Sequence, residues 1–161
     1  MSGQHKRYEI DGLYVQFDFS DIKRIVAHSL KKSKNEIGGI ITGKYVEERK
    51  YAVINTFHLP TKDSIRKPYN FIRGKSGINN LLKRLWKKEE YYLGEWHLHP
   101  YASPSASNTD MEQLLSIARK TDYKCPEPIM FIVGSDQVVF NINIYIVTDG
   151  TIKQMKEVPV Y

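Results

Sequence analysis

Apolar and polar residues alternate along the first part of the chain and then recur every three or four positions. The alternation over Tyr8–Phe17 predicts an opening strand. The helical spacing that follows predicts a helix capped by Ser20 and running to about Ser33. A short apolar strand, Ile37–Gly43, and a neighbouring strand, Tyr51–Leu59, come next. Together these patterns predict one strand before the first helix and two strands after it. The segment that follows, 60–74, reads as irregular and basic.

Helical spacing returns at Ile78–Lys88 and again at Ser107–Lys120, and between them Tyr91–His99 reads as a strand. The Ser- and Pro-rich stretch Pro100–Ala106 predicts the loop that joins this strand to the second of the two helices. The β-rich segments Ile129–Val133 and Val138–Val147 suggest a hairpin that turns at Gly134–Gln137. We expect an α/β (α+β) fold, a mixed β-sheet with helices packed on it.

The composition limits the class of protein. The 161 residues, 41% of them hydrophobic, are enough for one globular domain, 1–161, with a real core. The single cysteine, Cys125, excludes an intrachain disulfide framework and reads as a small packed residue. No apolar run approaches the ~20 residues of a membrane helix, and no signal-like segment opens the chain. We therefore expect a cytoplasmic protein that does not associate with membranes.

The positive charge is concentrated in one segment. The net charge is +6, and nine basic residues against Asp63 alone lie between Lys62 and Lys88. Such a segment fits an acidic protein partner or nucleic acid, or it is simply a solvated helix face with lysine stems lying along apolar surface. No helix-turn-helix, zinc-finger or RNP-type motif accompanies it, so nucleic acid is the less favoured partner.

The chemistry is concentrated around two histidines. On a strand, His97 and His99 point to the same face about 7 Å apart, close enough to hold one metal ion. Pro100 ends this strand, which suggests a site at a sheet edge. Asp110, near the start of the next helix, supplies a third ligand. Two histidines and one carboxylate leave a fourth zinc position open, as in catalytic rather than structural sites.

Hydrolysis also needs a general base, and the spacing alone leaves two candidates. Glu36 precedes the Gly38-Gly39 strand, and Glu95 shares a strand face with the two histidines. Ser107 could donate a hydrogen bond to an oxyanion. Taken alone, however, the Ser-x-x-Asp pattern that begins at Ser107 is most simply a helix cap, and a His-x-His pair is more often not a metal site.

The combined pattern resembles the JAMM (MPN+) metallopeptidases. Their motif is a Glu before a Gly-containing strand, then His-x-His-Pro and, seven residues after the second His, Ser-x-x-Asp. Here these are Glu36, His97-Leu-His99-Pro100 and Ser107-Asn-Thr-Asp110, with Leu98 where Ser or Thr is frequent. The resemblance implies a cytidine-deaminase-like fold and zinc held by His97, His99 and Asp110. It also implies Glu36 as the general base and Ser107 as the oxyanion stabiliser.

The family also suggests the partners. JAMM enzymes cleave peptide or isopeptide bonds next to the C-terminal tail of a ubiquitin-like modifier. This short chain is most similar to the prokaryotic branch, and within it to the deconjugating peptidases of bacterial CBASS anti-phage systems. That resemblance implies a substrate with an extended C-terminal tail, such as a conjugated cGAS/DncV-like nucleotidyltransferase, and an activating/conjugating-like enzyme in the same pathway. On the basic segment, Lys83, Lys87 and Lys88 are candidates for docking an acidic face of the substrate.

Two alternatives remain open from the sequence. One is a deubiquitinase-like or tail-processing JAMM enzyme of another bacterial ubiquitin-like pathway. The other is a non-catalytic or nucleic-acid-associated MPN protein, which the filled catalytic positions disfavour.

Overall fold

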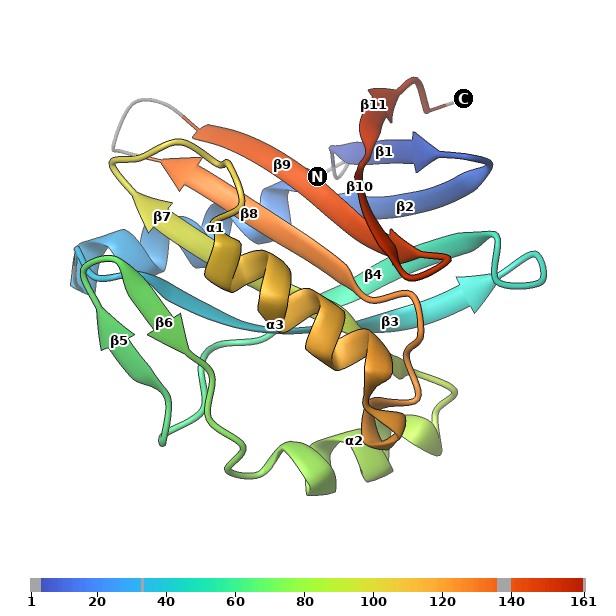
Figure 1. The fold of residues 1–161 in the computed structure, drawn as a ribbon, viewed down its shortest axis with the longest axis horizontal. Coiled ribbons are helices and arrows are strands. Elements are labelled where there is room, and N and C mark those ends of the chain that lie inside the picture. The colour runs from blue at the N-terminus through green and yellow to red at the C-terminus, as the bar shows by residue number, and fades with distance from the viewer. Residues whose placement is uncertain (1–3, 33, 136–139, 161) are drawn as a thin grey trace.

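A computed structural model describes residues 4–32, 34–135 and 140–160, and its ribbon is drawn in Figure 1. The helices are α1 (Phe19–Lys32), α2 (Ile78–Trp86), α3 (Asn108–Arg119) and the short 3-10 helix η1 (Thr121–Tyr123). The strands are β1 (His5–Ile10), β2 (Leu13–Asp18), β3 (Ile37–Val46), β4 (Tyr51–Phe57), β5 (Ile65–Lys67), β6 (Asn70–Ile72), β7 (Tyr91–Pro100), β8 (Ile129–Ser135), β9 (Phe140–Thr148), β10 (Thr151–Gln154) and β11 (Lys156–Val158). None of the described helices is long and apolar enough to cross a membrane.

The described strands form one large mixed sheet and one small one. The large sheet has the order β10-β9-β8-β7-β3-β4-β2-β1-β11, and β5 and β6 form the second sheet. Strand β7 runs antiparallel to β3 and parallel to β8, so it is a central strand. The expectation that the histidine strand lies at a sheet edge is therefore wrong. Its site lies at the carboxyl end of a central strand, where the pairing with β3 ends at Leu98 and the pairing with β8 continues to Pro100.

Helices cover both faces of the large sheet. In Figure 1, α3 crosses the front of the sheet and α1 lies behind it. Successive side chains of β8 pack on opposite faces of the sheet, one covered by α1 and the other by α3. Phe131 and Val133 join the core cluster that contains Ile22 of α1, whereas Ile132 packs with Leu114 of α3. The prediction of a mixed sheet with packed helices is confirmed.

The structure corrects the predicted N-terminal elements. Tyr8–Phe17 is two antiparallel strands rather than one, because Asp11 and Gly12 take positive φ values of 51° and 80° and turn the chain. Two consecutive residues with positive φ make a tight hairpin turn, for which Asp-Gly is a favoured sequence. The following helix begins at Phe19, so Ser20 lies inside it. Asp18 takes the capping position, because its Oδ1 accepts bonds from the Ser20 N–H and hydroxyl.

Two further parts of the chain differ from the prediction. Residues 60–74 contain the β5–β6 hairpin, whose strands of three residues are too short to leave a clear alternation in the sequence. The C-terminal β10 and β11 add strands at the two ends of the large sheet, and the pattern did not predict them. The β8–β9 hairpin is confirmed by its antiparallel pairing, although residues 136–139 of its turn lie outside the described residues, as does residue 33 at the predicted helix end. Cys125 is buried, as expected.

Candidate metal centre and active site

The pairing of β3 with β7 brings Glu36 to the two histidines. In the antiparallel register Gly38 faces His97 and Ile37 faces Leu98, and one further step sets Glu36 opposite His99. Residues directly opposite in a sheet share a face. Accordingly, His99 Nε2 lies 3.8 Å from Glu36 Oε1. The intervening Trp96 and Leu98 side chains are fully buried on the other face.

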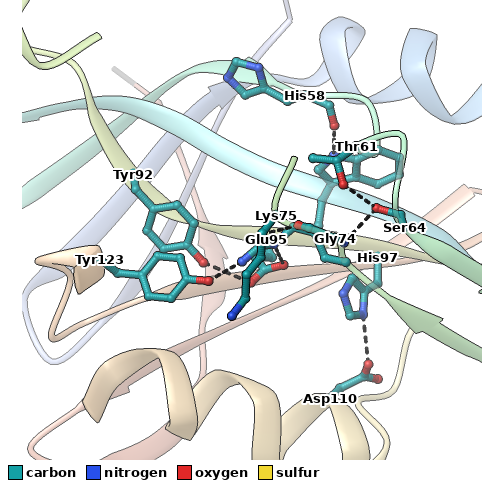
Figure 2. Close-up of polar contacts among 12 residues, drawn as sticks. His58, Thr61, Ser64, Gly74, Lys75, Tyr92, Glu95, His97, Asp110 and Tyr123 are labelled. Carbon is teal, nitrogen blue, oxygen red and sulfur yellow. Dashed lines mark hydrogen bonds and ion pairs between the residues drawn. The ribbon is translucent and has the colours of Figure 1, made fainter. Parts of the chain in front are cut away.

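Helix α3 supplies Asp110 through its N-terminal cap. Ser107 Oγ accepts a bond from the Asp110 N–H at 3.1 Å, and Asp110 Oδ2 accepts one from the Ser107 N–H at 2.9 Å. This reciprocal pair is a capping box, so the simple helix-cap interpretation of this pattern is correct. The same carboxylate reaches the histidines. His97 Nδ1 lies 2.9 Å from its Oδ1, and His99 Nε2 lies 3.3 Å from its Oδ2. Figure 2 shows the His97–Asp110 contact.

A hydrogen bond identifies the ring nitrogen of His99 that carries a proton. Its Nδ1 donates to the Ser103 carbonyl oxygen at 3.2 Å, because a carbonyl can only accept. In the neutral ring, Nε2 then presents a lone pair toward the carboxylates of Asp110 and Glu36. When the ring is protonated instead, its Nε2–H donates to Asp110, and when the ring is neutral the lone pair is available to a cation. This is the arrangement of a histidine oriented by its second nitrogen for metal binding.

The electrostatics of the cluster follow from the same contacts. Burial alone would raise the pKa of Asp110, but hydrogen bonds from His97 and His99 lower that pKa well below its ordinary value. Burial would lower the pKa of His99, but the bond to Asp110 and the nearby Glu36 charge raise it above its ordinary value. The pKa of Glu36 is raised, chiefly by burial. The Asp110 carboxylate is thus held in its charged form.

The donor types and spacings fit a zinc ion. No group of three His, Cys, Asp or Glu side chains within residues 4–32, 34–135 and 140–160 already stands in metal-holding geometry. However, ligand atoms ~2.1 Å from a tetrahedral ion lie about 3.4 Å from one another, and His99 Nε2 and Asp110 Oδ2 are 3.3 Å apart. His97 Nε2 is buried and has no hydrogen-bond partner among the described residues.

Glu95, the other candidate base, is engaged elsewhere. Its Oε1 accepts a bond from Arg73 Nε at 2.7 Å, and its Oε2 accepts one from the Tyr92 hydroxyl at 3.0 Å. Arg73 also donates to the Gly74 carbonyl and to the Tyr123 hydroxyl. The Arg73–Glu95 ion pair is almost fully buried. Tyr92 and Tyr123 point toward Glu95 in Figure 2. The geometry therefore leaves Glu36, and not Glu95, with a carboxylate facing the histidine cluster.

Two residues that the sequence analysis gave no role shape the site around His97. Gly38 lies directly across from His97, and a Cβ there would come within 2.6 Å of His97 Cδ2 and 2.3 Å of the Trp96 carbonyl oxygen. Phe71 of β6 packs edge-on against His97, with 5.5 Å between the ring centroids. Of these two residues, the sequence pattern drew attention only to Gly38, because a glycine inside a predicted strand is unusual. The Phe71 contact depends on the β5–β6 hairpin, which was not predicted.

The three docking candidates lie apart from this cluster. Lys83 is on α2 and Lys87 and Lys88 follow it, and all three are exposed. Helix α2 packs near Tyr92 at the start of β7, whereas His99 is near its end. At ~3.3 Å per residue, seven residues of strand separate these points by roughly 23 Å. The docking candidates therefore lie near the start of β7, away from the histidine cluster at its end.

Comparisons with known proteins agree with this architecture. Residues 20–145 match the profile described as prokaryotic homologs of the JAB domain. A curated relative from Enterobacter hormaechei subsp. hoffmannii, named CD-NTase/cGAS isopeptidase, is 42% identical over 117 residues. The match covers 73% of this chain and 65% of the relative, so this chain spans less than two thirds of that protein. The solution structure of a protein from Desulfitobacterium hafniense is similar in fold, with a TM-score of 0.59 at 15% identity, covering 86% of this chain and 87% of that one.

Proposed function

This chain belongs to the family of prokaryotic JAB-domain homologs, and from that premise we propose that it is a zinc-dependent isopeptidase or peptidase. It hydrolyses the bond that follows the C-terminal tail of a ubiquitin-like or similarly conjugated protein. The observation that carries the proposal is that Asp110 contacts both His97 and His99, with the Glu36 carboxylate 3.8 Å from His99.

Each residue has a separate part in the proposed reaction. His97, His99 and Asp110 would hold the zinc ion, which would act as a Lewis acid toward the scissile carbonyl and favour the ionisation of water. Glu36 takes the proton from the attacking water and returns it to the leaving amine. Burial raises the pKa of Glu36, which makes its carboxylate a better proton acceptor. The Ser107 hydroxyl donates to the developing oxyanion while its oxygen still accepts from the Asp110 N–H.

The β5–β6 hairpin suits the binding of an extended tail. The Glu36 N–H donates to the Lys67 carbonyl oxygen at 2.9 Å, so the hairpin is fixed beside the general base. In a two-stranded sheet each strand has one edge that its partner does not cover, and an extended peptide can add to such an edge through main-chain hydrogen bonds. A tail bound there would lie beside Glu36, within reach of the histidine cluster.

The named relative supports a more specific substrate. We propose that the substrate is a conjugated cGAS/DncV-like nucleotidyltransferase and that an activating/conjugating-like enzyme of the same pathway makes the bond that this chain cleaves. We place this reaction in the cytoplasm, in CBASS anti-phage defence. The support is the 42% identity to a protein named CD-NTase/cGAS isopeptidase. The match covers 65% of that protein, so the support comes from this matched part and not from the rest of its length.

Cleavage of defined fusions tests the proposal. Candidate tails, from ubiquitin-like modifiers and from cGAS/DncV-like nucleotidyltransferases, are joined at their C-termini to a reporter protein and incubated with the purified chain. We expect cleavage directly after the tail, loss of cleavage with a chelator, and its recovery when zinc is restored. Cleavage that continues unchanged after the metal has been removed would overturn the zinc proposal.

A further inference from the structure

A groove lies between α2 and the segment that leads from α3 to β8. We call it the Trp86 groove and define it by Leu82, Lys83, Trp86, Lys87, Tyr123 and Lys124, with a volume of about 540 Å³. It is separate from the histidine cluster, because its lining includes Tyr92 at the start of β7 but none of the proposed zinc ligands. The proposed reaction gives this groove no role.

The aromatic side chains in the groove are held in place yet accessible. Trp86 is 52% exposed, which is high for the largest apolar side chain. Its ring meets the Tyr91 ring edge-on at 4.9 Å, and Lys124 Nζ lies 4.6 Å above it. Tyr123 packs at 4.6 Å against the buried Tyr92. Exposed tryptophans and tyrosines fixed beside a pocket are the residues that most often dominate binding energy at protein interfaces.

The charges around the groove favour a moderately acidic partner. Lys83, Lys87 and Lys124 line it, and in the described part of the chain none of them forms an ion pair. Glu90 and Asp122 also line it. These two carboxylates would repel the closely spaced phosphates of a nucleic acid. A peptide segment can instead place its few carboxylates beside the lysines alone.

We propose that the Trp86 groove binds an acidic segment of the protein substrate, which inserts an apolar side chain beside Trp86. This identification of the partner as the substrate rests on the proposed function. The distance from the histidine cluster, roughly 23 Å along β7, fits contact with the folded body of a substrate whose tail lies at the cluster. The groove therefore adds affinity without taking part in the chemistry. Of the three lysines that the sequence offered for docking, Lys83 and Lys87 line the groove and Lys88 does not.

The two tryptophans provide an internal control for the test. Trp96 is fully buried and its Nε1–H donates to the His58 carbonyl oxygen, whereas Trp86 is exposed. The probe is a twelve-residue peptide of serine and glycine with one central leucine and three nearby glutamates, titrated while the two indole N–H signals are followed by NMR. We expect the Trp86 signal to shift and the Trp96 signal to stay, and a lysine peptide with the same leucine to give no shift.

A matched pair of variants tests the location. Lys83→Glu/Lys124→Glu changes two lining residues, and Arg84→Glu/Lys88→Glu makes the same change in net charge at exposed positions outside the lining. The first pair should weaken peptide binding at least about tenfold and the second by less than about threefold. Equal weakening by the two pairs, absence of any Trp86 shift at millimolar peptide, or a Trp86 shift with oligo-dT in place of the peptide overturns the proposal. Binding is measured without turnover, so this outcome is independent of whether any tail fusion is cleaved.

Discussion

His97 Nδ1 and Asp110 Oδ1 lie 2.9 Å apart, and both side chains are buried. The two residues come from different elements, a central strand and the first turn of the following helix. Asp110 therefore has two tasks, because its carboxylate closes the cap of α3 and also contacts both histidines. The start of the helix and the candidate metal centre are thus fixed by the same side chain.

Ser107 also has two tasks, and two substitutions separate them. Ser107→Ala removes both the cap acceptor and the hydroxyl donor, so it should cost about 1 kcal/mol of stability and about 10²–10³ in kcat. Ser107→Asp keeps a good cap acceptor but has no hydroxyl to donate. It should lose a similar amount of kcat with little loss of stability. Urea unfolding and tail cleavage measured on both variants test this, and normal kcat in Ser107→Asp would exclude the oxyanion role.

Gly38 leaves the space that the His97 ring occupies. A methyl group at Gly38 would press on the ring and on the Trp96 carbonyl oxygen, so Gly38→Ala should displace His97. We expect a loss of about 1–3 kcal/mol in the free energy of unfolding from overpacking. Zinc affinity should fall roughly 10- to 100-fold, as for other residues that orient a ligand. Competition with a zinc chelator measures the affinity, and an unchanged value would show that the ring position does not depend on Gly38.

The buried Arg73–Glu95 ion pair joins the segment after β6 to the histidine strand. Removing either partner leaves the other charge buried, so Arg73→Leu or Glu95→Leu should each destabilise the fold by about 3–5 kcal/mol. The double variant should be less destabilised than the sum, because no buried charge remains. A double-mutant cycle by urea unfolding measures this coupling. Additive losses would contradict the pairing.

Asp63 gives a pH-dependent test of the segment before α2. Its carboxylate accepts bonds from the Lys75 and Ser76 N–H groups, which lower its pKa to about 2. The unfolded value is about 3.9. Because the folded pKa is the lower one, the stabilisation is complete above about pH 5 and disappears progressively as the pH falls toward about 1. The difference in unfolding free energy between wild type and Asp63→Ala should follow that course, and a difference independent of pH would contradict it.

The sequence predicted the local parts of the site better than the long-range ones. The spacing of His97 and His99 places both on one face of any strand, and Ser107-x-x-Asp110 is a cap signal in itself. The position of Glu36 opposite His99 depends on the β3–β7 register, which no local pattern contains. For that reason spacing alone could not separate Glu36 from Glu95, and the family resemblance was needed.

The elements that were missed have physical explanations. Strands β5 and β6 are three residues long, so Phe71 could not be assigned to a face from its neighbours. The basic segment was visible as a charge run, but the groove beside it needs Tyr123 and Lys124 from much later in the chain. The central position of β7 likewise follows from its pairing with β8, which is a distant strand in the sequence.

The central claim is that Glu36 is the general base of a zinc hydrolase, and one comparison tests it most directly. Single-turnover cleavage of a nucleotidyltransferase-tail reporter is measured for wild type, Glu36→Gln and Glu95→Gln, each folded and with its bound zinc determined. We predict that Glu36→Gln binds zinc normally but loses about 10²–10⁴ in rate, whereas Glu95→Gln stays within about tenfold of wild type because Glu95 is paired with Arg73. Full activity in zinc-loaded Glu36→Gln would contradict the account.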